Sequence, residues 1–226
     1  MPAGSVLAEY DARHPKRLVR DEATLPAEEL AIAAEIRSQA RRSGFAAGRL
    51  ALHAALAESA DPACAARPVL RDARGRPAPT WEDAPPISIA HSRIRALAGF
   101  APRGSCAAIG VDVEEVDEHR AHALVRMSLS PEENARVAAV DPAMLAGPIA
   151  LWCAREACVK AHALEVGWFG TTLVARCFEA ISDPASLVEG AERAWRIEIA
   201  FESRAPFVAH AWQARDAVFA AAVRPA

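Results

Sequence analysis

Three acidic residues of this sequence could form one reactive site. Asp112 and Glu114 alternate with valines in the sequence GVDVE, and the two-residue period of a strand places both carboxylates on one face. Glu156 and Lys160 are four residues apart in WCAREACVKA, so they share one face of a helix. Taken alone, the first motif is typical of a strand with a solvated acidic face, and the second of a surface ion pair.

The neighbours of Glu156 favour a reactive site over a solvated helix face. They are mostly apolar, so we expect the charged pair to lie in a partly buried cleft. Three carboxylates that share a site repel one another unless a cation neutralises them. Ligands that are all oxygens favour Mg²⁺, with Mn²⁺ as the alternative, and Lys160 could then steady a phosphate or a departing oxyanion. The pattern indicates phosphoryl-transfer chemistry without a Walker-type glycine loop.

Helices and strands must position these side chains. Apolar periodicity and capping signals predict helices over residues 24–39, 43–58, 131–140 and 148–163. The N-terminal half also contains a proline-rich stretch with a short strand at 69–70, then strands at 87–90, 96–101 and 107–114 that we expect in one sheet. Strand-type residues separated by turn signals predict further strands at 172–178, 195–201, 207–214 and 217–223. The fold class predicted is α+β, in two halves that divide near 102–106.

The composition excludes several classes of protein. The 226-residue chain is 52% hydrophobic and 24% charged, with a formal net charge of −3, so no nucleic acid or anionic membrane is expected as a partner. The five cysteines form no regular framework, and we expect reduced, mostly buried thiols. The chain begins without an apolar leader and has no apolar run of about 18 residues, so we expect a cytoplasmic protein without a membrane span.

The motifs resemble those of a known family. GVDVE and WCAREACVKA, about forty residues apart, resemble the two signature motifs of the surfactin-type 4′-phosphopantetheinyl transferases. The segment ISIAHS (87–92) resembles the strand of that family that ends in Ser-His-Ser, and RRSGFAAGR (41–49) is similar to the basic helix motif of the enterobactin-type branch. The order and spacing of the four elements also agree with the family.

The resemblance implies a fold and a reaction. Two similar α/β-type halves, each a small antiparallel sheet packed with helices, would form a pseudo-twofold arrangement in one monomeric chain. Residues 1–104 would bind the phosphates of coenzyme A, and residues 105–226 would hold Mg²⁺. The enzyme would transfer the 4′-phosphopantetheine arm of coenzyme A to a serine of an apo acyl or peptidyl carrier protein, and would release 3′,5′-ADP.

The resemblance also assigns roles to single residues. Asp112, Glu114 and Glu156 would bind Mg²⁺ beside the diphosphate, and Asp112, Glu156 and Lys160 would be the catalytic residues. Glu156 is a candidate base for the carrier serine, and Lys160 would help 3′,5′-ADP depart. The remaining phosphate charge of the coenzyme would be bound by His91 and by arginines at the family's basic positions, Arg41, Arg49, Arg71 and Arg76.

Three positions depart from the family pattern. Ala90 stands where many relatives have a serine, which removes a hydroxyl from the expected phosphate pocket. Arg155 replaces a common lysine beside the glutamate. Glu29 falls near a position where some relatives have a lysine. The segment 119–133, with apolar residues between Arg120 and Arg126, would offer a docking face to an acidic carrier protein, although the same residues also suit a core.

Two other functions fit parts of the sequence. A binding module for coenzyme A and a carrier protein would keep the fold without transfer, but the acidic residues and Lys160 are intact. An arginine-rich nucleic-acid binder would need interleaved aromatic residues, which are scarce. The sequence leaves open whether a fatty-acid, polyketide or nonribosomal-peptide carrier is the partner.

Overall fold

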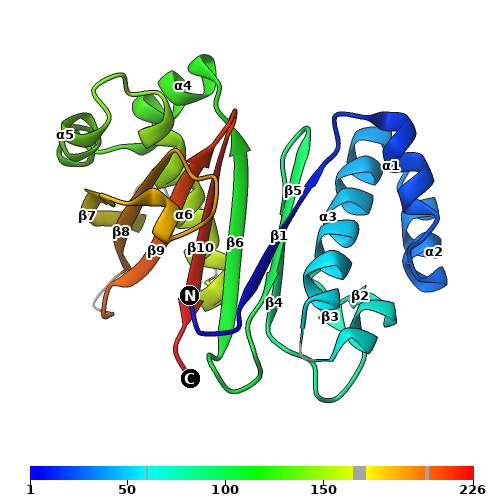
Figure 1. Cartoon of the computed structure of the whole chain (residues 1–226). Coiled ribbons are helices and arrows are strands. Elements are labelled where there is room, and N and C mark those ends of the chain that lie inside the picture. Colours follow the sequence, from blue (N-terminus) through cyan, green and yellow to red (C-terminus); the bar gives the residue numbers. More distant parts are fainter. Residues whose placement is uncertain (60, 165–171, 202–203) are drawn as a thin grey trace. The chain divides into compact units, whose positions relative to one another are not determined.

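The protein consists of two compact units. The computed structural model describes residues 1–59, 61–164, 172–201 and 204–226. The first unit comprises Met1–Ile109 with Pro225–Ala226, and the second comprises Gly110–Arg224 (Figure 1). Each unit has its own cluster of buried apolar residues, so each can be described separately.

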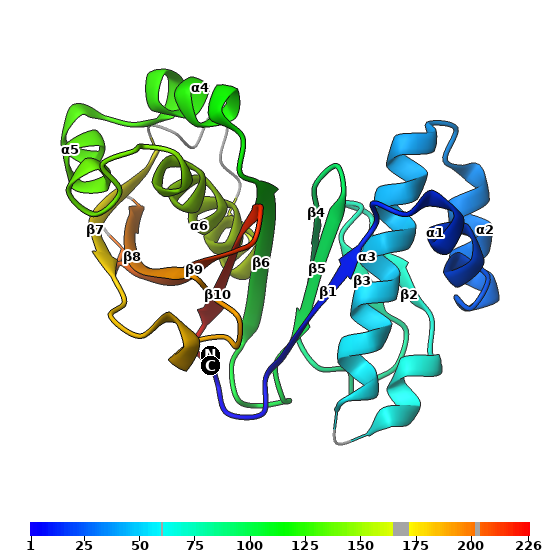
Figure 2. The ribbon, with the colours of Figure 1, turned by 45° about the horizontal axis from the view of Figure 1, so that its top comes forward.

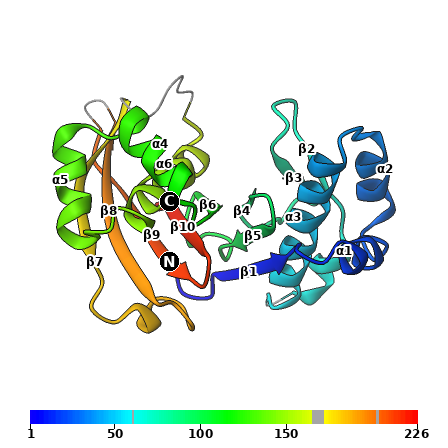
Figure 3. The ribbon, with the colours of Figure 1, turned by 90° about the horizontal axis from the view of Figure 1, so that it is seen from above.

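The first unit is a three-stranded antiparallel sheet covered by helices. The strand order is β1 (Val6–Asp11), β5 (Arg95–Phe100) and β4 (Ile87–His91), and every residue of the central strand β5 is buried. Helix α3 (Gln39–Ala57) packs on the sheet through small and apolar residues such as Ala46, Ala51 and Leu52. Helices α1 (Pro15–Glu22) and α2 (Ala27–Glu35) lie on the other side of α3 (Figure 3).

A second, two-stranded sheet belongs to the same unit. The 3₁₀ helix η1 (Pro62–Ala66) leads into the hairpin of β2 (Val69–Arg71) and β3 (Pro77–Pro79). The buried Glu29 of α2 ties this hairpin to the helices, because its Oε1 accepts a 2.7 Å hydrogen bond from the Val69 amide and its Oε2 lies 3.0 Å from His53 Nε2 of α3. Glu29 is therefore a structural residue of the first unit.

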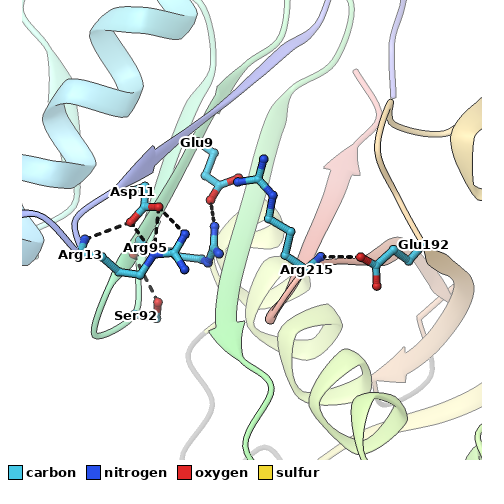
Figure 4. Close-up of polar contacts among 7 residues, drawn as sticks. All are labelled: Glu9, Asp11, Arg13, Ser92, Arg95, Glu192 and Arg215. Carbon is cyan, nitrogen blue, oxygen red and sulfur yellow. Dashed lines mark hydrogen bonds and ion pairs between the residues drawn. The ribbon is translucent and has the colours of Figure 1, made fainter.

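Charged pairs also fix the strands of the first sheet. The almost completely buried Arg95 of β5 pairs with Glu9 of β1 (Figure 4). At the end of β1, Arg13 donates through Nε to Asp11 at 2.9 and 3.0 Å. These hydrogen bonds are the main reason that the pKa of Asp11 is lowered to about 2, against the opposing effect of burial.

The second unit is a five-stranded sheet that curves around one helix (Figure 2). The buried helix α6 (Ala146–His162) packs mainly on β10 and β9. Helices α4 (Glu118–Ser128) and α5 (Pro131–Val140) pack against α6, and α5 also contacts β7. The strand order is β6 (Ala108–Glu115), β10 (Ala217–Arg224), β9 (Phe207–Ala214), β8 (Arg193–Phe201) and β7 (Leu173–Ala180).

A single buried carboxylate joins three elements of this unit. Glu133 closes a capping box with Ser130 at the start of α5, which satisfies two amides of the helix terminus. Its Oε1 also accepts hydrogen bonds of 2.6 Å from Arg155 Nη2 of α6 and from the Ala175 amide of β7. The fully buried Arg155 donates further to the carbonyls of Leu173 and Ser128. Arg155 therefore serves to join helices and a strand.

Several sequence-based expectations are confirmed. The fold is α+β with antiparallel sheets, α5 has the predicted bounds, and α6, β9 and β10 lie within two residues of theirs. No disulfide joins the five cysteines, and four of them are buried. No helix in the described part of the chain has the length and apolarity to cross a bilayer. The pseudo-twofold arrangement stays a prediction.

Other expectations are wrong. Strand β6 does not join β4 and β5 but lies in the sheet of the second unit, beside β10. The helix expected over 24–39 covers only Ala27–Glu35, because the backbone becomes extended at Ile36. Ser38 then caps α3, which begins at Gln39, four residues before the predicted start at 43. The sequence patterns also missed β1, α1 and α4.

Candidate functional site

The first unit contains a pocket of about 680 Å³ between α3, β4 and the hairpin of β2 and β3. Four of the five predicted phosphate-binding residues line it, namely Arg41, Arg49, Arg71 and His91. Its other lining residues are Glu35, Ile36, Arg37, Ser38, Gly44, Phe45, Gly75, Pro77 and Ile89. The pocket therefore gathers four arginines against a single carboxylate, which suits an anionic ligand.

Helix α3 supplies the centre of this pocket through residues spaced by four. Arg41, Phe45 and Arg49 lie on one helix face, because positions four apart are neighbours on a helix. The guanidinium carbons of Arg49 and Arg71 lie 5.0 and 4.9 Å from the centre of the Phe45 ring. The aromatic ring thus holds two cations beside the cavity, at the distance of a cation–π contact.

Arg49 has hydrogen-bonding capacity left over. Its side chain is 3% exposed, and Nη2 donates a 3.1 Å hydrogen bond to the Leu70 carbonyl. Its Nε and Nη1 are buried and have no hydrogen-bond partner among the residues that the structure describes. Burial lowers the pKa of Arg49 to about 10, opposed by the nearby Glu29 and assisted by Arg71. A buried guanidinium with two unused donors is costly unless an anion satisfies it.

His91 reaches the pocket because residue 44 is a glycine. A Cβ at Gly44 would lie 2.8 Å from His91 Nδ1, closer than nonbonded atoms approach. Only glycine therefore leaves room for the imidazole in this position. Ala90, by contrast, is buried and absent from the lining of the pocket, so its methyl group takes no part in the cavity.

Arg76 is held away from the cavity. It is absent from the lining, and its Nε and Nη2 both lie 2.7 Å from Asp72 Oδ2 within the hairpin. Glu29 is likewise absent from the lining, because its carboxylate is used by Val69 and His53. Arg76 is the one predicted phosphate-binding residue that the described structure does not bring to this pocket.

The second unit brings the signature acidic residues into one cluster. Val111 and Val113 of β6 are buried, Asp112 is 8% exposed, and Glu114 is half-buried. Lys160 of α6 donates 2.8 Å to Asp112 Oδ1 and 3.0 Å to the Val111 carbonyl. Burial alone would lower the pKa of Lys160, but Asp112 and Glu156 raise it overall, so the lysine stays charged.

A second cation pairs with Glu114. Arg120, in the first turn of α4, donates through Nη2 to Glu114 Oε1 at 2.7 Å. Its guanidinium carbon also lies 5.3 Å from the centre of the Trp152 ring on α6. Burial raises the pKa of Glu114, Arg120 lowers it, and Asp112 raises it again, with a net rise.

Glu156 lies on the half-buried face of α6 with Trp152 and Lys160. Burial raises the pKa of Glu156, and the negative charge of Asp112 raises it further, against the effects of Lys160 and Arg120. No hydrogen bond to Glu156 occurs among the described residues. A half-buried carboxylate with a raised pKa is suited to accept a proton.

The fully buried Cys153 lies close enough to the cluster for its charges to affect the thiol. Burial raises the pKa of its thiol well above the usual value, and the negative charges of Asp112 and Glu114 add to the effect. Cys153 is therefore a neutral thiol, and the charge of the cluster resides in three carboxylates and two cations.

No three His, Cys, Asp or Glu side chains within the described ranges are arranged to hold a metal ion. In the acidic cluster, Lys160 and Arg120 pair with two of the three predicted ligands. The three carboxylates remain electrostatically coupled, since Asp112 raises the pKa values of both Glu114 and Glu156.

Sequence reasoning missed two residues of these sites. Phe45 lies inside the RRSGFAAGR motif but was not singled out, although its spacing of four from both Arg41 and Arg49 is a signal for the pocket. Arg120 was considered only as the edge of a docking face. No local pattern shows its pairing with Glu114, because that contact depends on how α4 folds back.

The fold and the sites define a class of protein. The chain is an α+β protein with an arginine-lined pocket in its first unit and a cluster of carboxylates with a lysine in its second. Residues 108–219 match the family model of the 4′-phosphopantetheinyl transferase superfamily. The match spans nearly all of the second unit and includes every member of the acidic cluster. No curated protein matches the chain.

Proposed function

We propose that this protein is a 4′-phosphopantetheinyl transferase of the surfactin and enterobactin type, which modifies a serine of an apo carrier protein with the arm of coenzyme A. The observation that carries the proposal is the cluster of Asp112, Glu114, Glu156 and Lys160, which lies within the segment matched by the superfamily. The family and the chemistry of the cluster agree on phosphoryl transfer.

The donor chemistry of the cluster fits a divalent cation. Asp112, Glu114 and Glu156 offer only oxygen ligands, which Mg²⁺ and Mn²⁺ prefer. Burial and mutual repulsion raise the pKa values of Glu114 and Glu156, so further positive charge would stabilise the cluster. When bound there, a divalent cation would neutralise charge on the diphosphate of coenzyme A.

The residues of the cluster have distinct roles in the proposed reaction. Glu156 accepts the proton of the carrier serine, whose oxygen forms a bond to the β-phosphorus of coenzyme A. The bond from that phosphorus to the oxygen of 3′,5′-ADP breaks, and the nucleotide leaves with the electron pair. Lys160, anchored by Asp112 and the Val111 carbonyl, supplies fixed positive charge near the departing oxygen.

We assign the arginine-lined pocket of the first unit to the phosphate charge of coenzyme A. Its support is the pair of unused donors on Arg49, beside Phe45 and Arg71. Arg41 and His91 also line the pocket and would contribute further charge and hydrogen bonds. Arg76 is not part of this assignment, because it pairs with Asp72.

The carrier protein would dock on the exposed face of α4. Leu124, which sequence reasoning included in that face, is 5% exposed and belongs to the core of the second unit. Met127 is 63% exposed, and Arg126 beside it is also exposed. An apolar side chain with a basic neighbour suits the acidic helix of a carrier protein. A monomeric enzyme in the cytoplasm stays a prediction, as does the pathway it serves.

Transfer can be tested by mass spectrometry. The protein, incubated with coenzyme A, Mg²⁺ and a panel of apo carrier proteins, should add about 340 Da, the mass of the arm, to a carrier serine. The isosteric change Glu156→Gln should slow transfer by about 10²- to 10⁴-fold, because it removes the base. Lys160→Ala should slow it by roughly 10²-fold or more, because it removes fixed charge.

Arg136→Gln is the matched control, since it removes a charge from α5, away from the cluster. It should leave transfer within about twofold, as expected for a residue without a role in the chemistry. Coenzyme binding without a mass gain on any carrier would contradict the proposal and would favour a binding module. Near-normal turnover by Glu156→Gln would contradict the role of the cluster.

A further inference from the structure

Glu29 is a fully buried carboxylate in the same unit as the arginine-lined pocket, although it does not line that pocket. Both of its oxygens have partners. Oε1 accepts the hydrogen bond from the Val69 amide, and His53 Nε2 lies 3.1 and 3.0 Å from Oε1 and Oε2. A carboxylate at this depth needs such partners, because burial removes its water.

Two neighbouring sets of contacts place Glu29 close to Arg49. His53 and Arg49 are four residues apart on α3, so they share one face of that helix. Val69 and Leu70 are consecutive in β2. The amide of the first donates to Glu29, and the carbonyl of the second accepts from Arg49. Burial lowers the pKa of Arg49, and the charge of Glu29 is near enough to oppose this effect.

The two opposite charges nevertheless do not pair directly. No hydrogen bond joins Glu29 to Arg49 within the described ranges, and Nε and Nη1 of Arg49 have no partner there. A buried carboxylate and a nearby guanidinium ordinarily form an ion pair. Here the oxygens of Glu29 are used by His53 and Val69, so two donors of the arginine stay available to a ligand.

We propose that His53 is a positioning residue of the pocket, which holds the carboxylate of Glu29 away from Arg49 and thereby keeps the guanidinium open to a phosphate anion. Glu29 then acts as a counter-charge at a distance. It stabilises the buried guanidinium in the free protein without occupying its donors. The inference rests on the proposed function, which assigns the pocket to phosphate groups.

This arrangement gives the two side chains opposite effects on anion binding. Without the imidazole, the carboxylate loses a partner and can turn to the unused donors of Arg49, where it replaces the anion. With an amide in place of the carboxylate, the anion meets less repulsion and a guanidinium whose charge is less compensated. If Glu29 and His53 only tied the helices to the hairpin, changes at either residue would weaken binding.

Isothermal titration calorimetry of the full chain with 3′,5′-ADP tests the role of His53. His53→Leu should weaken binding about tenfold or more, as expected when hydrogen bonds of the anion to a charged group are lost. His53→Gln keeps an N–H donor for the carboxylate and should bind within about threefold of the wild type. His14→Leu is the matched control, since that imidazole is exposed and makes no capping hydrogen bond.

The same titration tests the role of Glu29. Glu29→Gln should bind the nucleotide about three- to tenfold more tightly, as expected when a nearby negative charge is removed. Glu28→Gln removes the same charge from an exposed position on α2 and should change the affinity by less than about twofold. When Glu29→Gln is already present, His53→Leu should no longer weaken binding, because no carboxylate remains to occupy Arg49.

Other outcomes overturn the inference. These are an unchanged affinity of His53→Leu, unchanged or weaker binding by Glu29→Gln, a loss by His53→Leu that persists when Glu29→Gln is present, and absence of 3′,5′-ADP binding to the wild type. Circular dichroism spectra and melting temperatures establish which variants are folded. Should His53→Leu not fold, the sign of the change in Glu29→Gln decides. Failure of transfer with an affinity that still depends on both residues in this way would contradict the proposed function and leave this inference standing.

Discussion

Arg49 shows how one buried side chain can report on a ligand. Two of its donors are buried without partners in the described part of the chain, and burial lowers its pKa to about 10. The free protein therefore bears the cost of a poorly satisfied charge. A bound anion would remove this cost. Replacement of Arg49 by an uncharged residue should therefore weaken anion binding without lowering the stability of the free protein.

The change Arg49→Met should abolish the rise in melting temperature that 3′,5′-ADP gives to the wild type. It should leave the melting temperature of the free protein unchanged or higher, because methionine fills similar space without a charge. Differential scanning fluorimetry measures both effects. Arg74→Met, at an exposed position outside the pocket, should keep the response to the nucleotide. A full response in Arg49→Met would contradict the assignment of the pocket.

Asp11 makes the stability of the first unit depend on pH. Hydrogen bonds from Arg13 lower its pKa from 3.8 to about 2. A carboxylate with a lower pKa in the folded state stabilises the fold above its unfolded pKa, and this stabilisation is lost as the pH falls through the folded value. The contribution of Asp11 should therefore be complete at neutral pH and should disappear between about pH 4 and pH 2.

Urea unfolding of Asp11→Asn at several pH values tests this dependence. The midpoint should lie below that of the wild type at pH 7, and the difference should shrink as the pH approaches 2. Asp183→Asn, whose side chain is exposed and makes no capping hydrogen bond, is the control. A difference that stays constant at low pH would show that the ionised form of Asp11 is not what stabilises the strand.

At the scale of elements, the close approach of β6 and α6 positions the acidic cluster. A Cβ on Gly110 would lie 1.9 Å from the Ala157 carbonyl oxygen and 2.6 Å from the Ala161 amide nitrogen. Both are backbone atoms of α6, so they cannot move without the helix. Glycine at this position lets Asp112 of the strand lie within hydrogen-bonding distance of Lys160 of the helix.

Gly110→Ala should lower the free energy of unfolding by about 3 kcal/mol and should also slow transfer, because overpacking moves backbone. Chemical denaturation measures the first effect. Gly104→Ala is the comparison, since a Cβ there meets open space and only the positive φ of 77° opposes it. This second change should cost about 1–2 kcal/mol and leave transfer intact. Equal effects of the two changes would argue against a tight contact between β6 and α6.

Local patterns predicted the elements that carry clear signals. Ser130 and Pro131 marked the start of α5, and strand-type residues between turns marked the four C-terminal strands. Helix α1 was missed because it is mostly polar and buries Leu18 and Glu22. The pairing of β6 was wrong because its neighbour β10 lies about one hundred residues further along the chain, and the period of a strand does not report its partner.

The sites were predicted to the extent that spacing within one element defined them. The period of a strand related Asp112 to Glu114, and the period of a helix related Glu156 to Lys160, whereas Arg41 and Arg49 were assigned from the resemblance to the family. Arg76 was assigned to the pocket from its place in the motif, but a neighbouring aspartate pairs with it. Arg120 of α4 contacts Glu114 of β6 and Trp152 of α6. The spacing of residues within one helix or strand does not predict such contacts between elements.

At the scale of the whole molecule, two separate cores support two separate sites. The buried clusters of the two units share no residue, and the arginine-lined pocket and the acidic cluster belong to different units. A ligand that binds only the folded state of one unit stabilises mainly that unit. The two sites should therefore be separable in one experiment.

Hydrogen exchange resolved along the chain tests this separation. The nucleotide 3′,5′-ADP should slow exchange in α3 and β4 of the first unit, and Mn²⁺ should slow exchange in β6 and α6 of the second. Arg49→Met should remove only the first effect, and Asp112→Asn only the second. Protection by 3′,5′-ADP that survives Arg49→Met without loss would contradict the proposed division of roles.

The buried ion pair between Glu133 and Arg155 has a consequence for protein engineering. Glu133 on α5 and Arg155 on α6 satisfy each other inside the second unit, and an unmatched charge at such a depth costs about 3–5 kcal/mol. A chimera that transplants residues 131–140 from a relative without this carboxylate would orphan Arg155, the immediate neighbour of Glu156. Residues 133 and 155 should therefore be exchanged together whenever hybrid enzymes are built.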